Sequence, residues 1–574
     1  MQKISAPPDI PLNLTLNGNP VAEGDTAACF AKKIYEKVQS NVAKATLDAN
    51  GVYNGKCYLI VQNRNFMTKL DVMTCMDQLS NKKCEGFDRI PVCALYDART
   101  TLLNPMASLF EKIYNSGYIP EQWKVSKIIP IFKKGSKVEI KNYRPIANLC
   151  STSKIFEKLI LKQIHYLERI NKIDLTGKNQ HGFKRNKSTA TAGALLQSII
   201  ARAADEKNYV LMASLDLSMA FDVVNTELLV KRLKIMGLPM DLINLIREWL
   251  SNRSFYVQVG DDYSALFDSN AGTIQGSVLG PILYALFVSP LFDLTDLVNF
   301  ADDNFCVEWC KDRTLLIVNL EKKLEMITKW LKDSGLIVNE SKTEICMFHQ
   351  NDQPLVKIKL QNVEIESKKS MNVLGVIFDC KLNWQMHTAM AISKAKKSLY
   401  ALRLIKRFFN NHEMRTLLDS HFYSTLYYNS VIWLTPSLNN DMKQKLISIS
   451  ANALRDCLRL NNPEISFENL HKIHKKCTPK QITFYQMALK LHKLVNENLD
   501  DLNLEQITVM DQMICSRRQI NFEIHRNNTG KIGINTTANK LYPLNQLIGL
   551  NLLSLGYIHF KKLAKIQFLK NGNT

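Results

Sequence analysis

Two adjacent carboxylates interrupt an otherwise apolar stretch, and this feature constrains the fold more than any other. Asp302 and Asp303 separate the apolar runs 297–300 and 305–307. Neighbouring charges between two hydrophobic arms are costly unless a cation neutralises them. The pattern therefore predicts a hairpin over residues 296–308, apolar on both arms, with the acidic pair at its tip.

A third carboxylate ends another apolar run. Asp216 follows residues 210–215, whose continuous apolar pattern is typical of a buried strand. The end of a core strand is a rigid place from which a side chain can reach solvent. A few carboxylates and substrate phosphates are sufficient to hold Mg²⁺, and nucleotidyl transfer uses two such ions. We therefore take Asp216, Asp302 and Asp303 as candidate metal ligands.

The Asp-Asp dipeptide also occurs elsewhere, so local sequence alone leaves alternatives open. Asp261-Asp262 follows Gly260 and spells the motif of viral RNA-dependent RNA polymerases, whereas Asp500-Asp501 lies in a polar stretch. The arms around 261–262 carry more polar residues than those around 302–303. We interpret 255–267 as an exposed hairpin, and its acidic pair as a turn.

Charge and composition narrow the class of protein. The 574 residues carry a formal net charge of +21, and 46% are hydrophobic, which suffices for a sizeable core. Such a positive field attracts polyanions, above all nucleic acid. No apolar stretch reaches the length of a membrane span, and the N-terminus lacks a signal-peptide core. The thirteen cysteines show no Cys-x-x-Cys pair. A nuclear or cytoplasmic protein without a disulfide framework is expected.

The order of predicted elements is helices, then mixed helices and strands, then basic helices. This order predicts one α+β catalytic body with helical additions at both ends. Strands are expected at 125–132, 209–217, 344–348, 357–360 and 373–378. Helices are expected at 67–79, 92–113, 155–173, 241–250, 278–292, 315–334 and from 388 onward, and one more follows the 209–217 strand and runs through 238.

Three sequence motifs and their order along the chain are the strongest indication of the kind of protein. The segments 216–222 (DLSMAFD), 272–281 (GTIQGSVLGP) and 300–303 (FADD) follow one another along the chain. Together they resemble motifs A, B and C of reverse transcriptases, and the wording of the second is similar to that of non-LTR (LINE-type) retrotransposons. Segments 127–135, 142–146 and 181–184 resemble that family's finger motifs, and 335–344 and 373–376 resemble its motifs D and E. The resemblance covers about residues 65–410.

The resemblance implies a right-hand polymerase fold, with fingers, a palm built on an antiparallel sheet, a helical thumb and helical extensions. On this basis we expect an N-terminal extension at 1–64, fingers at 65–205 and a palm with motifs A to E at 206–385. A basic helical thumb is expected at 386–480, and a C-terminal region of unknown role at 481–574.

It also implies roles for individual residues. Asp216 and Asp302 would bridge two Mg²⁺ ions, with Mn²⁺ as the alternative ion; Asp303 would be a weaker ligand, and the Leu217 carbonyl would complete the shell. Phe221 would be the steric gate that selects dNTP over NTP, and Lys342 would protonate the leaving pyrophosphate. The residues expected to contact the nucleotide are Lys133, Lys134, Arg144, Leu217, Phe221, Gln275 and Gly276.

The function implied is that of an RNA-directed DNA polymerase acting on an RNA template, a DNA primer and dNTPs; protein partners are unknown. The alternatives are a catalytically weak or inactive RNA-binding protein that keeps the fold, and an RNA-dependent RNA polymerase using Asp261-Asp262. Only about 65 residues precede the first matched segment, and the tail lacks a Cys/His knuckle. We therefore expect a retrotransposon-derived chain without its endonuclease domain.

Overall fold

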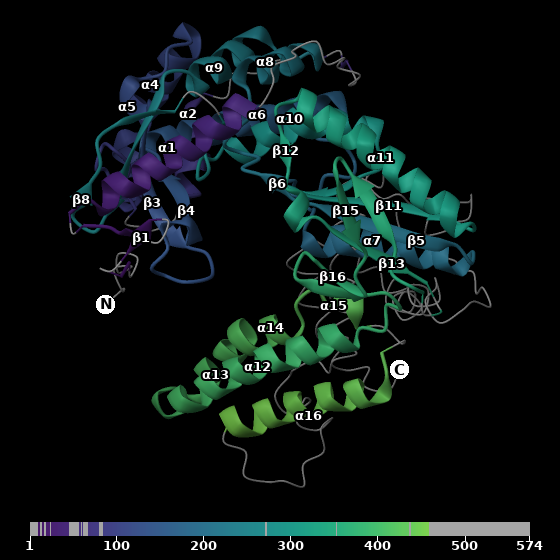
Figure 1. Cartoon of the computed structure of the whole chain (residues 1–574). Coiled ribbons are helices and arrows are strands. Elements are labelled where there is room, and N and C mark those ends of the chain that lie inside the picture. The colour runs from purple at the N-terminus through teal and green to yellow at the C-terminus, as the bar shows by residue number, and fades with distance from the viewer. Residues whose placement is uncertain are drawn as a thin grey trace, which may run out of the picture.

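The computed structural model describes residues 10–458 apart from short gaps at 12–13, 17–18, 23, 45–56, 59, 61–66, 80–83, 270–271, 350, 352 and 435–437. The described elements form an arc (Figure 1), with the helices α4, α5 and α9 at one end, the sheet containing β5 and β11 in the middle and the helices α12 to α16 at the other end. No helix among these residues combines the length and apolar character needed to cross a membrane.

The central sheet has four antiparallel strands in the order β10-β11-β5-β13. Strand β5 lies between two neighbours, and its residues alternate between two hydrophobic cores. Leu211 and Ala213 face the core that includes helix α11, whereas Val210 and Met212 face the core that includes helix α7. Burial on both faces explains the continuous apolar run. The strands are β5 (Tyr209–Leu215), β10 (Val298–Phe300), β11 (Asp303–Cys310) and β13 (Glu344–Phe348).

A second sheet, with the order β4-β3-β7-β8 and with β9 also paired to β7, lies at the end of the arc that contains α5 (Figure 1). Strands β3 and β7 are parallel, and the other pairs are antiparallel. Helix α1 (Thr26–Lys44) packs on this sheet through Phe30 and Ala31. The strands are β3 (Val125–Phe132), β4 (Tyr143–Asn148), β7 (Arg253–Val259), β8 (Asp262–Tyr263) and β9 (Phe267–Ser269).

Short two-stranded sheets complete the β-structure: β1 (Thr15–Leu16) with β2 (Asn19–Pro20), β6 (Leu217–Ser218) with β12 (Ile337–Val338), β14 (Lys357–Leu360) with β15 (Val363–Glu366), and β16 (Ser370–Val373) with β17 (Val376–Asp379). The pair β6–β12 joins the chain just after β5 to the segment after α11.

The helices before the central sheet and on its first face share one core. They are α2 (Lys69–Asp77), α3 (Val92–Asp97), α4 (Arg99–Ser116), α5 (Glu121–Lys124), α6 (Ser151–Asn171), α8 (Thr226–Ile235), α9 (Met240–Leu250), α10 (Gly280–Leu294) and α11 (Arg313–Asp333).

The helices of the second core are α7 (Thr189–Asp205), α12 (Gln385–Ile405), α13 (Asn411–Leu417), α14 (Ser424–Leu426), α15 (Ser430–Trp433) and α16 (Asn440–Cys457). The aromatic residues of this region fill that core: Phe422, Tyr423, Tyr427 and Trp433 are buried. Tyr428, by contrast, is exposed.

Most predicted elements are confirmed, but the helix expected at 92–113 is divided at Ala98 into α3 and α4. Two further elements need correction. A helix was expected directly after the β5 strand, but residues 219–223 form turns and α8 begins only at Thr226, because the Asn225 side chain caps it by accepting the Leu228 N–H. The single strand expected at 373–378 is a hairpin, β16–β17. Leu374 and Gly375 both adopt positive φ (49° and 84°), which turns the chain back on itself.

Candidate active site

Asp216 lies directly after the C-terminal end of β5, an inner strand of the central sheet. Its backbone carbonyl accepts a hydrogen bond from the Asn339 N–H (2.8 Å), and the next residue, Leu217, starts β6 and pairs with Val338. The backbone on both sides of Asp216 is therefore fixed by strand pairing. Its side chain keeps 38% of its surface exposed, so a rigid support presents a carboxylate to solvent.

The acidic pair lies at the turn between β10 and β11, as predicted. Strand β11 pairs with β5 in a register that sets Asn304 opposite Leu215. One residue further along this antiparallel ladder, Asp303 comes opposite Asp216. Asp302 and Asp303 are both exposed, as a turn at the end of a sheet allows.

The carboxylates are close enough to influence one another. Desolvation at the end of the sheet and, after it, the negative charges of Asp302 and Asp216 together raise the pKa of Asp303 to about 6. A raised pKa reports that the ionised form lacks compensation. Three acidic groups from β5 and the β10–β11 turn therefore form one negatively charged site.

This site fits a divalent cation that also binds a substrate. Within the described ranges, no three His, Cys, Asp or Glu side chains form a ready-made metal cage. Mg²⁺ does not require one, since it keeps several waters and is commonly held by one or two carboxylates together with substrate phosphates. The mutual repulsion at Asp303 is the charge imbalance that such an ion relieves.

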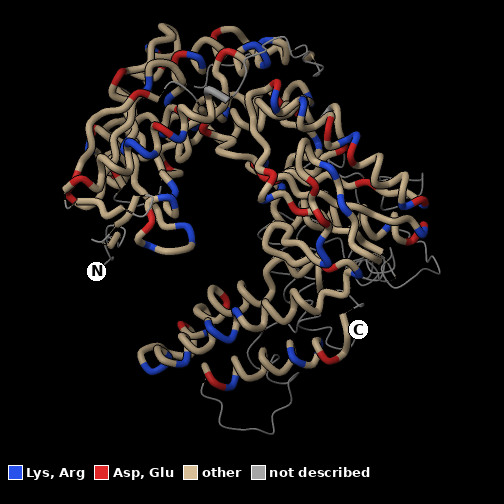
Figure 2. Tube along the Cα trace, viewed as in Figure 1, with Lys and Arg blue, Asp and Glu red and all other residues tan. Residues whose placement is uncertain are grey.

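Cations from other segments surround the acidic site. The Nζ of Lys342 lies 3.2 Å from Oδ2 of Asp216. Burial lowers the pKa of Lys133, and the positive charges of Arg144, Lys342 and Lys134 lower it further, while Asp216 acts in the opposite direction. The predicted phosphate-binding cations and Asp216 thus share one electrostatic neighbourhood. In Figure 2, Lys and Arg also mark the loop that joins β3 and β4.

Phe221 lies in the turns after β6 rather than on a helix. Its ring is half-buried, 4.4 Å from the ring centre of Tyr284 and 6.1 Å from that of Phe183. The Thr273 N–H donates to the Phe221 carbonyl at 2.6 Å, which ties this turn to the segment 272–280. Leu217 lies in β6 with a buried side chain.

Gln275 and Gly276 lie against strand β4. The Ala147 N–H donates to the Gln275 carbonyl (2.8 Å), and Gly276 adopts φ +120°. A Cβ at Gly276 would lie 2.3 Å from the Ala147 carbonyl oxygen, so only glycine permits this approach. The glycine therefore lets the segment before α10 pack directly on the β3–β4 sheet.

A buried carboxylate that sequence reasoning missed supports the same segment. Oε2 of Glu157, on α6, accepts the backbone N–H groups of Val278 (2.7 Å) and Leu279 (3.2 Å) at the start of α10. Glu157 is fully buried; burial raises its pKa, while these hydrogen bonds and the charge of Arg253 lower it. A single Glu within a charged helix gives no sequence signal for such a contact.

The competing acidic pair has a structural partner. Oδ2 of Asp262, in β8, accepts the backbone N–H of Ala27 at the start of α1 (2.9 Å). A carboxylate is favourable at a helix N-terminus. Asp261-Asp262 therefore lies on the second sheet, beside α1. The remaining pair, Asp500-Asp501, and the whole predicted region 481–574 lie outside the described residues.

The basic residues of α12 and of the two positions that follow it are mostly exposed. Five of these six cations are exposed, and Lys406 is partly buried; Nε of Arg403 also pairs with Asp456 on α16 (2.9 Å). The six are Lys394, Lys396, Lys397, Arg403, Lys406 and Arg407.

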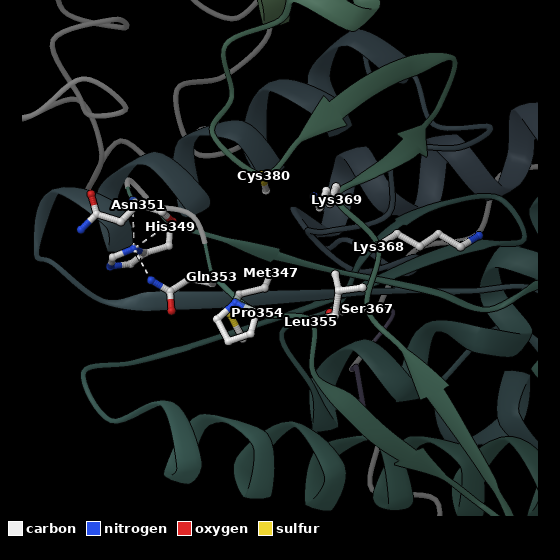
Figure 3. Close-up of a pocket in the computed structure, with 10 residues that line it drawn as sticks. All are labelled: Met347, His349, Asn351, Gln353, Pro354, Leu355, Ser367, Lys368, Lys369 and Cys380. Carbon is white, nitrogen blue, oxygen red and sulfur yellow. Dashed lines mark hydrogen bonds between the residues drawn. The ribbon is translucent and has the colours of Figure 1, made fainter.

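A small pocket next to β13 contains none of the predicted site residues (Figure 3). His349, Lys368 and Cys380 are among its lining residues, and Nδ1 of His349 contacts the Asn351 N–H (3.1 Å) and Nε2 of Gln353 (3.2 Å). The ring of His349 also stacks on Tyr209. These contacts hold the His349 ring in place.

Comparison with known proteins agrees with the motif order. Residues 131–378 match the model of the family described as reverse transcriptase (RNA-dependent DNA polymerase). Among solved structures, apo telomerase from Candida tropicalis aligns with 16% identity and a TM-score of 0.31 over 49% of this chain and 59% of that one, a likeness too low to support a conclusion.

Two relatives come from Drosophila melanogaster. The probable RNA-directed DNA polymerase from transposon BS is 28% identical over 58% of this chain, and the RNA-directed DNA polymerase from mobile element jockey is 28% identical over 56%. The chain spans only 38% and 36% of the lengths of these relatives. Over residues 131–378 the chain therefore carries a domain of the reverse transcriptase family, of the kind found in LINE-type (non-LTR) retrotransposons.

Proposed function

We propose that this protein is an RNA-directed DNA polymerase that extends a DNA primer on an RNA template by two-metal nucleotidyl transfer. The observation that carries the proposal is the register of β5 and β11, which pairs Asn304 with Leu215 and so brings the adjacent residues Asp303 and Asp216 to the same end of the sheet, where the charges of Asp302 and Asp216 act on Asp303. Three carboxylates at the end of a rigid sheet, with cations around them, suit a reaction between a hydroxyl and a triphosphate.

Asp216 and Asp302 would hold the metal ions, with Asp303 as a weaker ligand and the Leu217 carbonyl completing the shell. When bound, Mg²⁺ or Mn²⁺ supplies activation of the primer's 3′ hydroxyl and charge compensation for the leaving pyrophosphate. The fixed backbone around Asp216 supports this role, because a ligand on paired strands needs no rearrangement before the reaction.

The surrounding residues would bind and orient the nucleotide. Lys133, Lys134 and Arg144 would contact the triphosphate, where arginine can bind two oxygens at once and lysine acts as a point charge. Gln275 and Gly276 would lie against the new base pair, with Gly276 allowing close backbone approach.

Two further residues would act on selectivity and on the proton balance. Phe221 would exclude a 2′ hydroxyl and so select dNTP. Lys342 would give a proton to the departing pyrophosphate, and its contact with Asp216 keeps it at the reacting centre.

The proposal also assigns the parts of the chain. Residues 65–205 would form the fingers, 206–385 the palm and 386–480 the thumb, with 1–64 as an N-terminal extension and no role assigned to 481–574. The exposed cations on α12 would contact duplex phosphates without reading sequence. Such a function would place the protein in the nucleus or the cytoplasm.

Primer extension tests the proposal. Purified protein, a DNA primer annealed to an RNA template and Mg²⁺ are supplied with either dNTPs or NTPs. We expect dNTP incorporation that Asp302→Asn abolishes, whereas the matched control Asp261→Asn keeps it. Duplex binding without incorporation would instead indicate an inactive RNA-binding protein. Preference for NTPs, lost in Asp261→Asn, would indicate an RNA polymerase.

A further inference from the structure

Three buried carboxamide side chains lie at the base of the turn that carries Asp302 and Asp303. Gln180 and Asn299 are fully buried, and Asn304 keeps 3% of its surface exposed. Buried amides are costly unless their polar atoms are bonded, so three of them next to one turn need a physical reason.

Gln180 holds the first half of the turn. Its Oε1 accepts the backbone N–H of Gly182 (2.8 Å) and that of Ala301 (3.2 Å). The chain around Gln180 also runs beside β10, since the His181 N–H donates to the Asn299 carbonyl (2.8 Å). A segment 121 positions away in sequence thus fixes the residue directly before Asp302.

The turn needs this support because Ala301 has a strained backbone. Ala301 adopts φ +59°, a left-handed conformation that is unfavourable for a residue with a Cβ. The neighbouring segment must also come very close: a Cβ on Gly182 would lie 2.2 Å from the Ala301 nitrogen. Gly182 allows this approach, and the Gln180 oxygen then holds the Ala301 N–H in place.

Asn304 holds the second half. Its Nδ2 donates to the Asp302 carbonyl (2.8 Å), while its Oδ1 accepts from Nδ2 of Asn299. Buried amides therefore bind backbone groups on both sides of the acidic pair.

The unpaired amide nitrogen of Gln180 shows which of its polar atoms matters. Within the described part of the chain, its Nε2 is buried without a hydrogen-bond partner. An apolar side chain of similar size would avoid this cost. The value of glutamine at this position therefore lies in its acceptor oxygen.

We propose that Gln180 is a positioning residue that fixes the 301–303 turn so that Asp302 and Asp303 face Asp216 in metal-binding geometry. It touches neither metal nor nucleotide and acts through the backbone of Ala301. The inference rests on the proposed function, because it assumes that these carboxylates bind metal.

The test compares Gln180→Leu with a matched control, Gln163→Leu. Gln163 is also fully buried, but lies on α6 and donates from Nε2 to the Tyr114 hydroxyl. Three quantities are measured on the full chain: the midpoint of thermal unfolding, the affinity for Mn²⁺ in the presence of a saturating dNTP analogue by electron paramagnetic resonance, and hydrogen exchange of the Ala301 amide.

Both variants are expected to lose some thermal stability. Only Gln180→Leu should speed exchange at Ala301 and weaken Mn²⁺ binding, by about tenfold to a hundredfold, as loss of a residue that orients a metal ligand typically does. Unchanged Mn²⁺ affinity or unchanged exchange in Gln180→Leu, or equal weakening in Gln163→Leu, would overturn the proposal.

The variant Asp302→Asn distinguishes failure of the positioning role from failure of the proposed function. If Asp302→Asn weakens Mn²⁺ binding and Gln180→Leu does not, the positioning role alone is wrong. If wild-type protein binds Mn²⁺ no better than Asp302→Asn, the metal site itself is absent and the proposed function fails with it.

Discussion

The Nζ of Lys342 lies 3.2 Å from Oδ2 of Asp216, a residue 126 positions earlier in the chain. Both side chains remain partly exposed, at 59% and 38%, so solvent and substrate can reach the pair. The contact places an ammonium group at the acidic site, where the proposed reaction releases pyrophosphate.

Lys342→Met should slow the chemical step without preventing nucleotide binding. If Lys342 protonates the leaving group, its loss should reduce kcat by about a hundredfold, the lower range for general acid catalysis, and leave KM for dNTP nearly unchanged. Single-turnover incorporation measures this effect. Lys329→Met, at an exposed lysine on α11, serves as control. A large rise in KM with an unchanged kcat would assign Lys342 to binding instead.

Phe221→Ala should relax sugar selection. Removing the ring that packs on Tyr284 opens space beside the nucleotide, so the ratio of kcat/KM for dNTP over NTP should fall by about tenfold or more. Competition between the two nucleotide types in primer extension gives this ratio.

Tyr284→Phe is the control for Phe221, since it keeps both rings and removes a buried hydroxyl that lacks a hydrogen-bond partner in the described structure. It should leave selectivity unchanged. If Phe221→Ala leaves selectivity equally unchanged, Phe221 is a packing residue.

Glu157→Ala should destabilise the protein and loosen the turn at Gln275 and Gly276. The substitution removes the acceptor of two backbone N–H groups and leaves the buried Arg253 without its nearby negative charge. Removing one partner from such a buried set costs about 3 kcal/mol or more. Urea unfolding measures the loss, and KM for dNTP should rise.

Glu248→Gln is a comparable control, because it disturbs the ion pair of the buried Lys124 on α5. It should lower stability without changing KM. An equal rise in KM in both variants would show that the effect of Glu157 on the turn is not specific.

His387 should make the protein sensitive to mild acid. Burial and, to a smaller extent, the positive charge of Lys394 together lower the pKa of His387 to about 4; Nδ1 accepts the Ile377 N–H. The pKa of His387 is lower in the folded state than in the unfolded state. Its contribution to the free energy of unfolding is therefore fully present above about pH 6.5 and is lost as the pH drops toward 4. Between pH 7.5 and pH 5 the free energy of unfolding should fall by about 2 kcal/mol.

Urea unfolding of wild type and His387→Leu at both pH values checks this. The variant should lose about 2 kcal/mol less than wild type between pH 7.5 and pH 5. Identical pH dependence in the two proteins would exclude His387 as the source.

Elements whose signal is local were predictable from sequence. The β5 strand was predictable because its two buried faces produce a continuous apolar run, and the 296–308 hairpin because its arms are apolar on both sides of Asp302 and Asp303. The β16–β17 turn was missed, since Leu374-Gly375 is not among the dipeptides that mark a two-residue hairpin.

The supports of the candidate site were not predictable in this way. Glu157 and Gln180 bind backbone N–H groups 121 residues away, and a single buried polar residue leaves no periodic trace in the sequence. The register that brings Asp303 and Asp216 to the same end of the sheet likewise depends on long-range pairing. Sequence motifs indicated which residues to consider, and the fold supplied their relative placement.

The most direct test is an experimental structure of the protein bound to an RNA template, a DNA primer, an incoming dNTP analogue and Mg²⁺. We expect two metal ions about 3.5–4 Å apart, held between Asp216 and Asp302, with the triphosphate facing Lys133 and Arg144. Metal ions bound elsewhere, or a nucleotide bound away from the 301–303 turn, would contradict the proposed function.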